Sequence, residues 1–378
     1  MLLITGFDPW AVGNGSSMRA GHWCRALEGA GGFEAVVVPT AGTTPTGFRR
    51  VPLPTDDEVV RGAAQLMGAR WREWMLRADP LPEAATRVPA WMGRALLPEL
   101  PWRPDGVVVF KMTLAPLAAD LALECGVPLV VDLDDDEATL ARSVGRADAD
   151  AVERLLQGTA GLAAVVTLAA DTDAAAVATR VGTTVRVVPN VVAVPAPMPP
   201  GRPGSALYVA NFDYAPNRAS ARWLLDEVVP HVEGLHELSV VGPFSQRLEC
   251  APPVVAHGKV PDLQPYYNDA AVVVCPVLAG SGTSIKVIEA MACGRPVVTT
   301  TVGARGLGLV DGEHAVITDD PLAFAAAVSR LLMAPDEAAA LGGRGRALVA
   351  ERYSAVSGAA AMTSALLAAL GSPGDAVR

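Results

Sequence analysis

The amino-acid sequence predicts an α/β protein made of two similar domains, each built around a parallel β-sheet. The chain has 378 residues, which is enough for two or three domains. Half of the residues are hydrophobic and only 19% are charged, as is typical of a compact globular protein. Short apolar runs rich in β-branched residues alternate with helical segments, and this alternation is typical of βαβ units.

The first half of the chain contains one series of such units. Strands are predicted in the sequences LLITGF, FEAVVVPT, VVVFKM, PLVVDLD, AVVTLAA and VRVVPN, of which the last ends at Asn190. Helices are predicted between them, at residues 16–30, in two stretches within 56–100, at 114–125, in one long segment at about 137–157, and after AVVTLAA.

The second half repeats the pattern after a proline-rich segment. Residues 191–204, VVAVPAPMPPGRPG, contain too much proline for a helix or a central strand and predict a linker. Strands are then expected in ALYVANF, LSVVGP, VVAHGKV, VVVCPVL, PVVTTT and HAVIT, with helices at 217–232, around Tyr266, and at 321–333, 336–352 and 355–370.

We therefore expect one domain at residues 1–190, a second at 205–353, and a C-terminal segment at 354–378 that returns to the first. Two such domains create a cleft, and open α/β sheets bind ligands beyond the carboxyl ends of their strands.

Composition restricts the possible partners and the cellular location. The net charge of -10 argues against duplex nucleic acid as a partner, because backbone binding needs a basic surface. No apolar run reaches the roughly 18 residues of a membrane span. The five cysteines are scattered without a Cys-x-x-Cys pair, which favours a cytoplasmic location. Trp71 and Trp74 lie among arginines and would fit a helix at a lipid surface, but nearby acidic residues favour an acceptor-site or surface helix.

The stretch from Ala279 to Val298, AGSGTSIKVIEAMACGRPVV, has the pattern of an anion-binding turn. A buried strand leads into a loop of small residues, and a helix then begins with Thr283 or Ser284 as its N-cap. Glycines beside a free helix N-terminus expose amide N–H groups and partial positive charge, which favours a phosphate ligand. A P-loop lysine follows its glycine directly, whereas Lys286 lies four residues beyond Gly282, so Walker chemistry is not expected.

Lys286 and Glu289 lie three residues apart and share one face of this helix. If that face lines the cleft, Lys286 can neutralise a phosphate, and Glu289 can accept hydrogen bonds from a vicinal diol such as a ribose. The alternative is a solvated Lys-Glu pair on an ordinary surface helix, since such pairs are common.

The span 280–306, GSGTSIKVIEAMACGRPVVTTTVGARG, resembles the signature of the retaining glycosyltransferases of family 4, which have the GT-B fold of two Rossmann-like domains. The segments NFDYAPNRASARWLLDEVVPHV, HGKVPDL and DGEHAVITDDP and a final YS are also similar to that family, so the resemblance covers most of residues 208–354. It implies that Glu289 binds ribose hydroxyls and that backbone groups near Lys259 and Val260 meet the base. The implied diphosphate site comprises the loop and helix start: Gly280, Ser281, Gly282, Thr283 and Ser284.

The sequence departs from this family at three positions. Ser281 stands where most members carry the first of two glutamates, which implies altered sugar recognition. The family's arginine and lysine that grip the diphosphate would fall near Asn211 and Asn217, and Arg218 is a candidate substitute. Phosphate binding would then depend more on Lys286.

In the first domain, Gly13, Asn14 and Gly15 follow the first strand, at the position where the family's glycine loop approaches donor and acceptor. Gly15 is thus a candidate donor contact and Asn14 a candidate acceptor contact, with an ordinary turn as the alternative. Arg19, on the following helix, is a candidate second phosphate contact and a candidate acceptor contact.

The acidic run VDLDDDE, residues 131–137, follows a buried strand, so its carboxylates are expected at the cleft. Asp134 aligns with a histidine that many family members place against the donor sugar. Asp132 and Asp135 are candidate acceptor contacts. Two alternatives remain: Asp135 or Asp136 caps the next helix, or Asp132 and Asp134 form the Asp-x-Asp metal site of single-domain GT-A transferases.

Together these observations predict a glycosyltransferase that moves a sugar from a nucleotide donor to an unidentified acceptor, with retention and without a metal. Asp134, Lys286 and Glu289 are the candidate catalytic residues. A nucleotide-sugar epimerase and a non-catalytic donor-binding subunit of a partner transferase are the alternatives.

Overall fold

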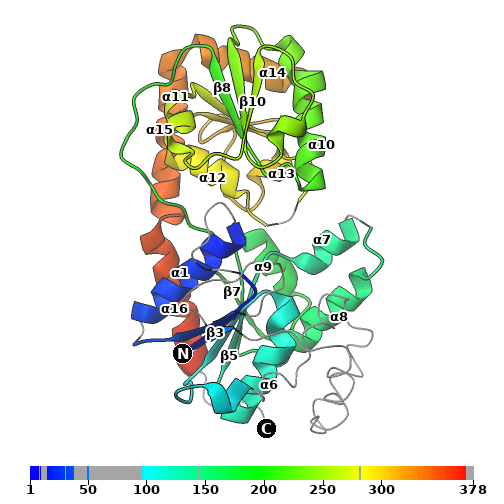
Figure 1. Cartoon of the computed structure of the whole chain (residues 1–378), viewed down its shortest axis with the longest axis vertical. Coiled ribbons are helices and arrows are strands. Elements are labelled where there is room, and N and C mark those ends of the chain that lie inside the picture. Colours follow the sequence, from blue (N-terminus) through cyan, green and yellow to red (C-terminus); the bar gives the residue numbers. More distant parts are fainter. Residues whose placement is uncertain are drawn as a thin grey trace. The chain divides into compact units, whose positions relative to one another are not determined.

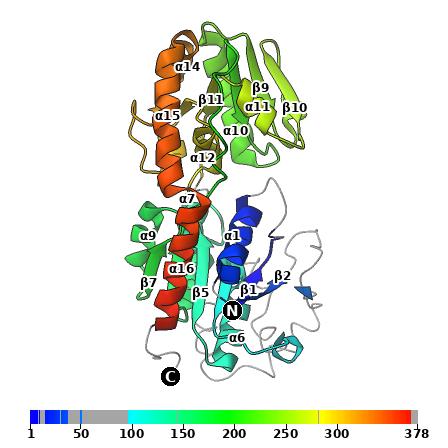
Figure 2. The same ribbon diagram turned by 90° about the vertical axis from the view of Figure 1, so that its left-hand side faces the viewer.

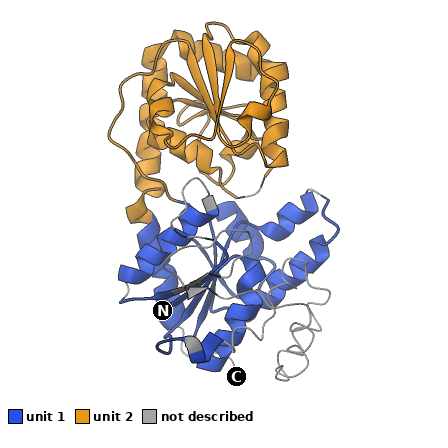
Figure 3. Ribbon diagram, viewed as in Figure 1, with its two compact units in different colours: residues 1–190, 358–378 blue, residues 191–357 orange. Residues whose placement is uncertain are grey.

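The computed structural model describes residues 1–7, 9, 15–29, 31–37, 49–50, 96–143, 145–280 and 282–371. The chain divides into two compact units (Figure 3). Unit 1 comprises Met1–Asn190 and Gly358–Arg378, and unit 2 comprises Val191–Ser357. None of the described helices is both long and apolar enough to cross a membrane.

Unit 1 is built on a parallel sheet of seven strands in the order β3-β2-β1-β4-β5-β6-β7 (Figure 1). The order changes direction between β1 and β4, which is the switch point where open α/β sheets bind ligands. The strands are β1 (Leu2–Thr5), β2 (Glu34–Val37), β3 (Arg49–Arg50), β4 (Val107–Phe110), β5 (Leu129–Asp134), β6 (Val165–Leu168) and β7 (Thr184–Val187).

Helices cover both faces of this sheet, because alternate strand residues point to opposite sides. In β1, for example, Leu2 and Ile4 belong to one buried core and Leu3 to the other. Figure 2 shows α1 and α16 on the same side, where they pack against the second core. The helices of unit 1 are α1 (Gly15–Gly29), η1 (Leu97–Glu99), η2 (Met112–Leu114), α6 (Ala115–Cys125), α7 (Glu137–Ser143), α8 (Ala149–Ala160), α9 (Asp171–Ala178) and most of α16 (Ala355–Gly371).

Unit 2 repeats this arrangement with a parallel sheet of six strands in the order β10-β9-β8-β11-β12-β13. Its switch point lies between β8 and β11. The strands are β8 (Ser205–Val209), β9 (Glu237–Val241), β10 (Val254–Gly258), β11 (Val272–Cys275), β12 (Val297–Thr299) and β13 (Val316–Ile317). The helices are α10 (Ala215–Trp223), η3 (Leu224–Val228), η4 (Val229–His231), η5 (Ser245–Arg247), α11 (Gln264–Asp269), α12 (Ile285–Ala292), α13 (Thr301–Ala304), α14 (Pro321–Met333) and α15 (Pro335–Arg352).

Two predicted helices differ from the structure. The single helix expected at 137–157 is wrong: α7 ends at Ser143, Gly145 adopts a left-handed φ of 67°, and α8 begins at Ala149. The helix expected at 217–232 is α-helical only as far as Trp223 and continues as a π-helical turn and a 3₁₀ turn that contains Pro230.

Candidate functional site

The predicted donor residues of unit 2 gather at the carboxyl edge of its sheet. Because all six strands are parallel, the loops after their carboxyl ends meet at one edge. Asn211, Asn217 and Arg218 follow β8, Lys259 and Val260 follow β10, and the glycine loop follows β11. Lys259 is exposed, and Val260 is half-buried.

The loop after β11 leads into a helix whose first turn has unpartnered polar groups. Gly282 has a left-handed φ of 67°, which a glycine adopts without strain. Ser284, rather than Thr283, occupies the N-cap position of α12, but its side chain does not cap the helix. Its Oγ is buried and has no hydrogen-bond partner among the described residues. The structure likewise shows no described acceptor for the amides of Ile285 and Lys286, so three donors are available here.

Lys286 points toward the first turn of α10 rather than toward Glu289. Its Nζ donates to Oδ1 of Asn217 at 2.9 Å and lies 6.0 Å from the ring centre of Tyr208. Burial lowers the pKa of Lys286. Lys286 and Glu289 are both half-buried, and the described structure contains no ion pair between them, so they do not form a solvated surface pair.

The carboxylate of Glu289 has no described hydrogen-bond or ion-pair partner. Burial alone raises the pKa of its carboxyl group to about 7. The hydroxyl of Tyr267 on α11 is also buried without a described partner, and burial followed by the charge of Glu289 raises the pKa of Tyr267. This part of unit 2 therefore contains several buried polar groups that have no partner among the described residues and that a ligand or water would satisfy.

Arg218, the candidate substitute for the missing basic pair, forms hydrogen bonds to the loop after β8. Its guanidinium group donates to the backbone carbonyls of Phe212 and Asp213 and so holds the loop after β8. Asn217 donates through Nδ2 to the carbonyl of Asn211 at 2.8 Å, which leaves its Oδ1 for Lys286. The structure therefore gives Arg218 a role in holding this loop, and its predicted contact with a diphosphate is not shown, whereas Lys286 points toward Asn217 at this edge.

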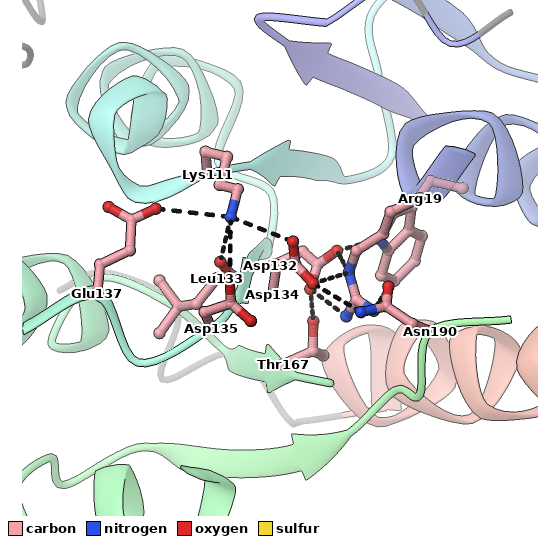
Figure 4. A network of polar contacts seen from close by, with 10 residues as sticks. Arg19, Lys111, Asp132, Leu133, Asp134, Asp135, Glu137, Thr167 and Asn190 are labelled. Carbon is pink, nitrogen blue, oxygen red and sulfur yellow. Dashed lines mark hydrogen bonds and ion pairs between the residues drawn. The ribbon is translucent and has the colours of Figure 1, made fainter. Parts of the chain in front are cut away.

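In unit 1, Arg19 and Asp132 form the centre of a buried polar network, shown in Figure 4. Nε and one Nη of Arg19 each donate to Asp132 at 2.7 Å. Trp23 and Thr167 donate to the same carboxylate at 2.6 and 2.7 Å, and Arg19 also reaches Asn190 at 3.1 Å. The side chains of Arg19 and Asp132 are 1% and 0% exposed. The predicted acceptor contacts at Arg19 and Asp132 are therefore corrected to a structural role, because neither side chain has a free surface.

A second cation, Lys111, holds the acidic run at the carboxyl end of β4 (Figure 4). Its Nζ lies 3.2 Å from Asp134, 4.0 Å from Asp135 and 3.7 Å from Glu137, and it donates to the carbonyl of Leu133 at 3.4 Å. Burial opposes a charged ammonium group, but these carboxylates outweigh it and raise the pKa of Lys111.

The pKa values of the neighbouring Asp134 and Asp135 are shifted in opposite directions. Burial would raise the pKa of Asp134, but Lys111 and Arg19 outweigh it and hold this pKa below its usual value. Burial and repulsion from Asp134 raise the pKa of Asp135 to about 8. The side chain of Asp134 is 11% exposed and that of Asp135 27%, so Asp135 presents more surface to a ligand.

Asp136, one of the two predicted capping residues, caps the helix that follows. Its carboxylate accepts from the amide of Thr139 at 3.1 Å and from its hydroxyl at 2.6 Å, and it also pairs with Arg180. The alternative Asp-x-Asp metal site does not fit the structure, because the oxygens of Asp132 already accept four hydrogen bonds. Among the described residues, no three or more His, Cys, Asp or Glu side chains form a group that could hold a metal ion.

Several predictions fall at the boundary of the described chain. Asn14, Ser281, Trp71 and Trp74 lie outside the described residues. Gly15 is the first residue of α1.

Lys111 and Tyr267 were not predicted as site residues from the sequence, and Glu137 was predicted at the cleft only as part of the acidic run 131–137. For Lys111 a signal was present: of the 30 lysine and arginine residues only three are lysines, at positions 111, 259 and 286. All three lie within the first residues after a strand or at the start of the helix that follows it, at the carboxyl edges of the two sheets. Lysine and arginine are not interchangeable. The position of these rare lysines at strand ends therefore indicates Lys111 as a candidate site residue, as it does Lys286.

Comparisons with known proteins agree with this architecture. Residues 203–334 match the family described as Glycosyl transferases group 1. The structure is similar to that of sucrose-phosphate synthase from Thermosynechococcus elongatus, with a TM-score of 0.70 and 18% identity over 96% of this chain and 97% of that one. It is also similar to Anabaena HepE in complex with UDP and glucose, with a TM-score of 0.68 and 13% identity over 97% and 98% of the two chains.

Among curated proteins, an uncharacterized protein of the cps region of Klebsiella pneumoniae is 36% identical over 64 residues, which are 17% of this chain and 16% of that protein. The prediction of two parallel-sheet α/β domains of the GT-B type is confirmed by the strand orders and by the solved structures. The group 1 domain in unit 2, together with this fold, indicates a glycosyltransferase.

Proposed function

We propose that the protein transfers a sugar from a nucleotide-sugar donor to an acceptor, and that the donor diphosphate binds at the amino end of α12. One observation carries the proposal: four polar groups without a partner among the described residues occur together at one short helix, namely Ser284 Oγ, the amides of Ile285 and Lys286, and the Glu289 carboxylate. Buried polar groups in folded proteins normally have partners. A bound ligand would supply them.

The chemistry of these groups fits a nucleoside diphosphate. Amides at a helix N-terminus and the ammonium group of Lys286 attract phosphate oxygens. The Glu289 carboxylate has no donors of its own, so it can accept from two adjacent hydroxyls such as those of a ribose. Hydrogen bonds from these hydroxyls would favour the ionised carboxylate and lower the pKa of Glu289 from its unliganded value of about 7.

In the proposed reaction, the bond between the anomeric carbon and the diphosphate oxygen breaks, and a bond to an acceptor oxygen forms. The acceptor proton passes to the leaving phosphate, so no side-chain base is required, and the anomeric configuration is retained as in family 4. The α12 amides and Lys286 stabilise the negative charge that develops on the leaving diphosphate. These groups provide the positive field, and the proposal therefore includes no metal.

Asp134 is the candidate in unit 1 for orienting a sugar hydroxyl. Its carboxylate is fixed by Lys111 at 3.2 Å and by Asn190 at 3.1 Å, and a small part of it remains exposed. Asp135 is the more accessible neighbour and is retained as a proposed acceptor contact. We also propose a cytoplasmic location, because the five cysteines form no disulfide bond.

Thermal unfolding with UDP, GDP and a panel of their sugars tests the proposal, with UDP and UDP-glucose first because HepE was solved with UDP and glucose. A tight ligand raises the midpoint, because it binds only the folded chain. Lys286→Met and Glu289→Ala should each weaken the affinity for the best nucleotide by about 1 to 3 kcal/mol. The matched control is Arg330→Met, which removes an exposed charge on α14 that pairs with Glu337 at 3.3 Å.

Wild-type nucleotide affinity in both site variants would refute the proposed site, and no thermal shift with any nucleotide would refute the function. Isomerised nucleotide sugar formed from donor alone would indicate the epimerase. Binding without transfer and without slow donor hydrolysis would indicate a non-catalytic subunit. Loss of activity with EDTA that Mn²⁺ restores would contradict the metal-free mechanism.

A further inference from the structure

A cavity of about 160 Å³ lies at the switch point of unit 1. Its lining residues are Gly6, Phe7, Lys111, Thr113, Leu114 and Glu137. Gly6 and Phe7 follow β1, and Lys111 follows β4, so the cavity lies beyond the carboxyl ends of these two paired strands. Switch points are the places where open α/β sheets bind ligands. Of this lining, only Glu137 was expected at a ligand site from the sequence, as part of the acidic run 131–137.

The cavity wall contains both apolar and polar side chains. Phe7, which packs against Phe110 with ring centres 5.6 Å apart, and Leu114 supply apolar surface. Lys111, Thr113 and Glu137 supply a donor, a hydroxyl and an acceptor. Such a wall suits a ligand that has both C–H surface and hydroxyl groups.

Charge excludes two other classes of ligand. Within the network of Figure 4, two cations, Arg19 and Lys111, face three ionised carboxylates, those of Asp132, Asp134 and Glu137. The pKa of the neighbouring Asp135 is raised to about 8, so this carboxyl group is mostly protonated near pH 7. A phosphate would be repelled by this excess of carboxylates. A metal ion would have to displace Lys111, which already occupies the position between Asp134 and Glu137.

The backbone at this point is unusual for residues with side chains. Lys111 and Asp134, at the ends of neighbouring strands, have left-handed φ values of 77° and 68°. Such conformations cost energy and persist where the surrounding structure enforces them, often at functional sites. Here they bring the two side chains together at 3.2 Å and place Lys111 at the cavity.

We propose that this cavity binds one six-membered ring of a hydroxylated acceptor, with Phe7 and Leu114 against the ring and with Lys111 and Glu137 on its hydroxyls. The volume of about 160 Å³ suits the ring itself, because an engineered cavity of about 150 Å³ binds benzene, and the ring substituents would extend through the opening of the cavity. The inference rests on the proposed function, since it assigns the acceptor to unit 1 while the nucleotide occupies unit 2.

The three lysines make the test direct. The full-length chain labelled with ¹³C at lysine Cε should give three NMR signals, which Lys→Arg variants assign. The probes are the methyl pyranosides of glucose, galactose, mannose and N-acetylglucosamine, with the open-chain polyol sorbitol as the control for ring shape. At least one pyranoside should move the Lys111 signal saturably, while Lys259 and Lys286 stay unchanged. UDP should move Lys286 and leave Lys111 unchanged.

Two variants confirm the location. Thr113→Met fills the cavity without touching the ion pairs, and Glu137→Gln removes one acceptor charge; each should weaken pyranoside binding by about tenfold or more. Arg146→Met, which removes an exposed charge paired with Asp148, should not change it.

The inference is overturned if no pyranoside moves Lys111, if sorbitol moves it equally, or if all three lysines respond alike. It is also overturned if Thr113→Met and Glu137→Gln bind like the wild type. Failure of UDP to move Lys286 refutes the nucleotide site instead, so the two failures are distinguishable.

Discussion

At the switch point of unit 1, Lys111 lies within 4.0 Å of three carboxylates, whereas at the switch point of unit 2, Lys286 faces one amide oxygen and no described carboxylate. The pKa of Lys111 is therefore raised above its usual value, although burial opposes this, and the pKa of Lys286 is lowered by burial. The same strand order thus presents charges that are already paired in one unit and unpaired in the other.

This difference indicates what each unit contributes. A fully paired network fixes its side chains before any ligand binds. Breaking such a network lowers the free energy of unfolding, because it leaves buried charges uncompensated. An unpaired set lowers the stability of the free protein and gains partners when a ligand binds. Substitution of a paired charge and substitution of an unpaired charge should therefore change stability in opposite directions.

The largest effect is expected for Arg19→Met in unit 1. The Asp132 carboxylate would lose its two bonds from Arg19 at 2.7 Å and remain buried. Breaking such a buried pair should lower the free energy of unfolding by about 3 to 5 kcal/mol. Urea denaturation measures this. An effect no larger than that of Arg146→Met, a solvent-exposed pair, would contradict the assignment of a structural role to Arg19.

A smaller effect of opposite sign is expected for Glu289→Gln in unit 2. The folded chain raises the pKa of Glu289 from an ordinary 4.5 to about 7, so the folded state prefers the proton, and its stability falls as pH rises between these values. Above pH 7 the substitution removes this penalty and should stabilise the free protein by about 1 to 3 kcal/mol. Near pH 4 it should have no effect, because the wild-type carboxyl group is protonated in both states.

Thermal unfolding of Glu289→Gln across pH 4 to 9 gives the measurement. Equal midpoints for variant and wild type at pH 8 would show that Glu289 has a partner in the free protein. The same variant should bind nucleotide more weakly, so a gain in stability and a loss in affinity are expected together.

The sequence predicted the elements that depend on local pattern. Apolar runs and helical periods gave both parallel sheets, and α14 has the predicted bounds, with Asp320 accepting from the amide of Ala323 as its N-cap. The failure at 137–157 is also local, because Gly145 ends one helix within a stretch that otherwise has helical composition.

Contacts between residues far apart in the chain could not be predicted in this way. Arg19 and Asp132 are separated by 113 positions, and nothing in either segment shows that their charges neutralise each other inside the unit. The acidic run therefore suggested exposed acceptor contacts, although burial removes Asp132 from any ligand. The three lysines were a usable signal, because their rarity in the composition coincides with their position at the strand ends.

The smallest effect is expected at Arg218, a charge of unit 2 that resembles those of unit 1 because it is already bonded. Its guanidinium group donates to the carbonyls of Phe212 and Asp213, and its side chain is exposed. Arg218→Met should therefore lower the free energy of unfolding by about 0.5 to 1.5 kcal/mol, the usual net value of a hydrogen bond. Isothermal titration with the best nucleotide should show almost unchanged affinity, unlike Lys286→Met. A loss of affinity comparable to that of Lys286→Met would mean that Arg218 leaves the two carbonyls and binds the diphosphate. Arg218 would then belong with the charges that are available to a ligand rather than with those that are already bonded.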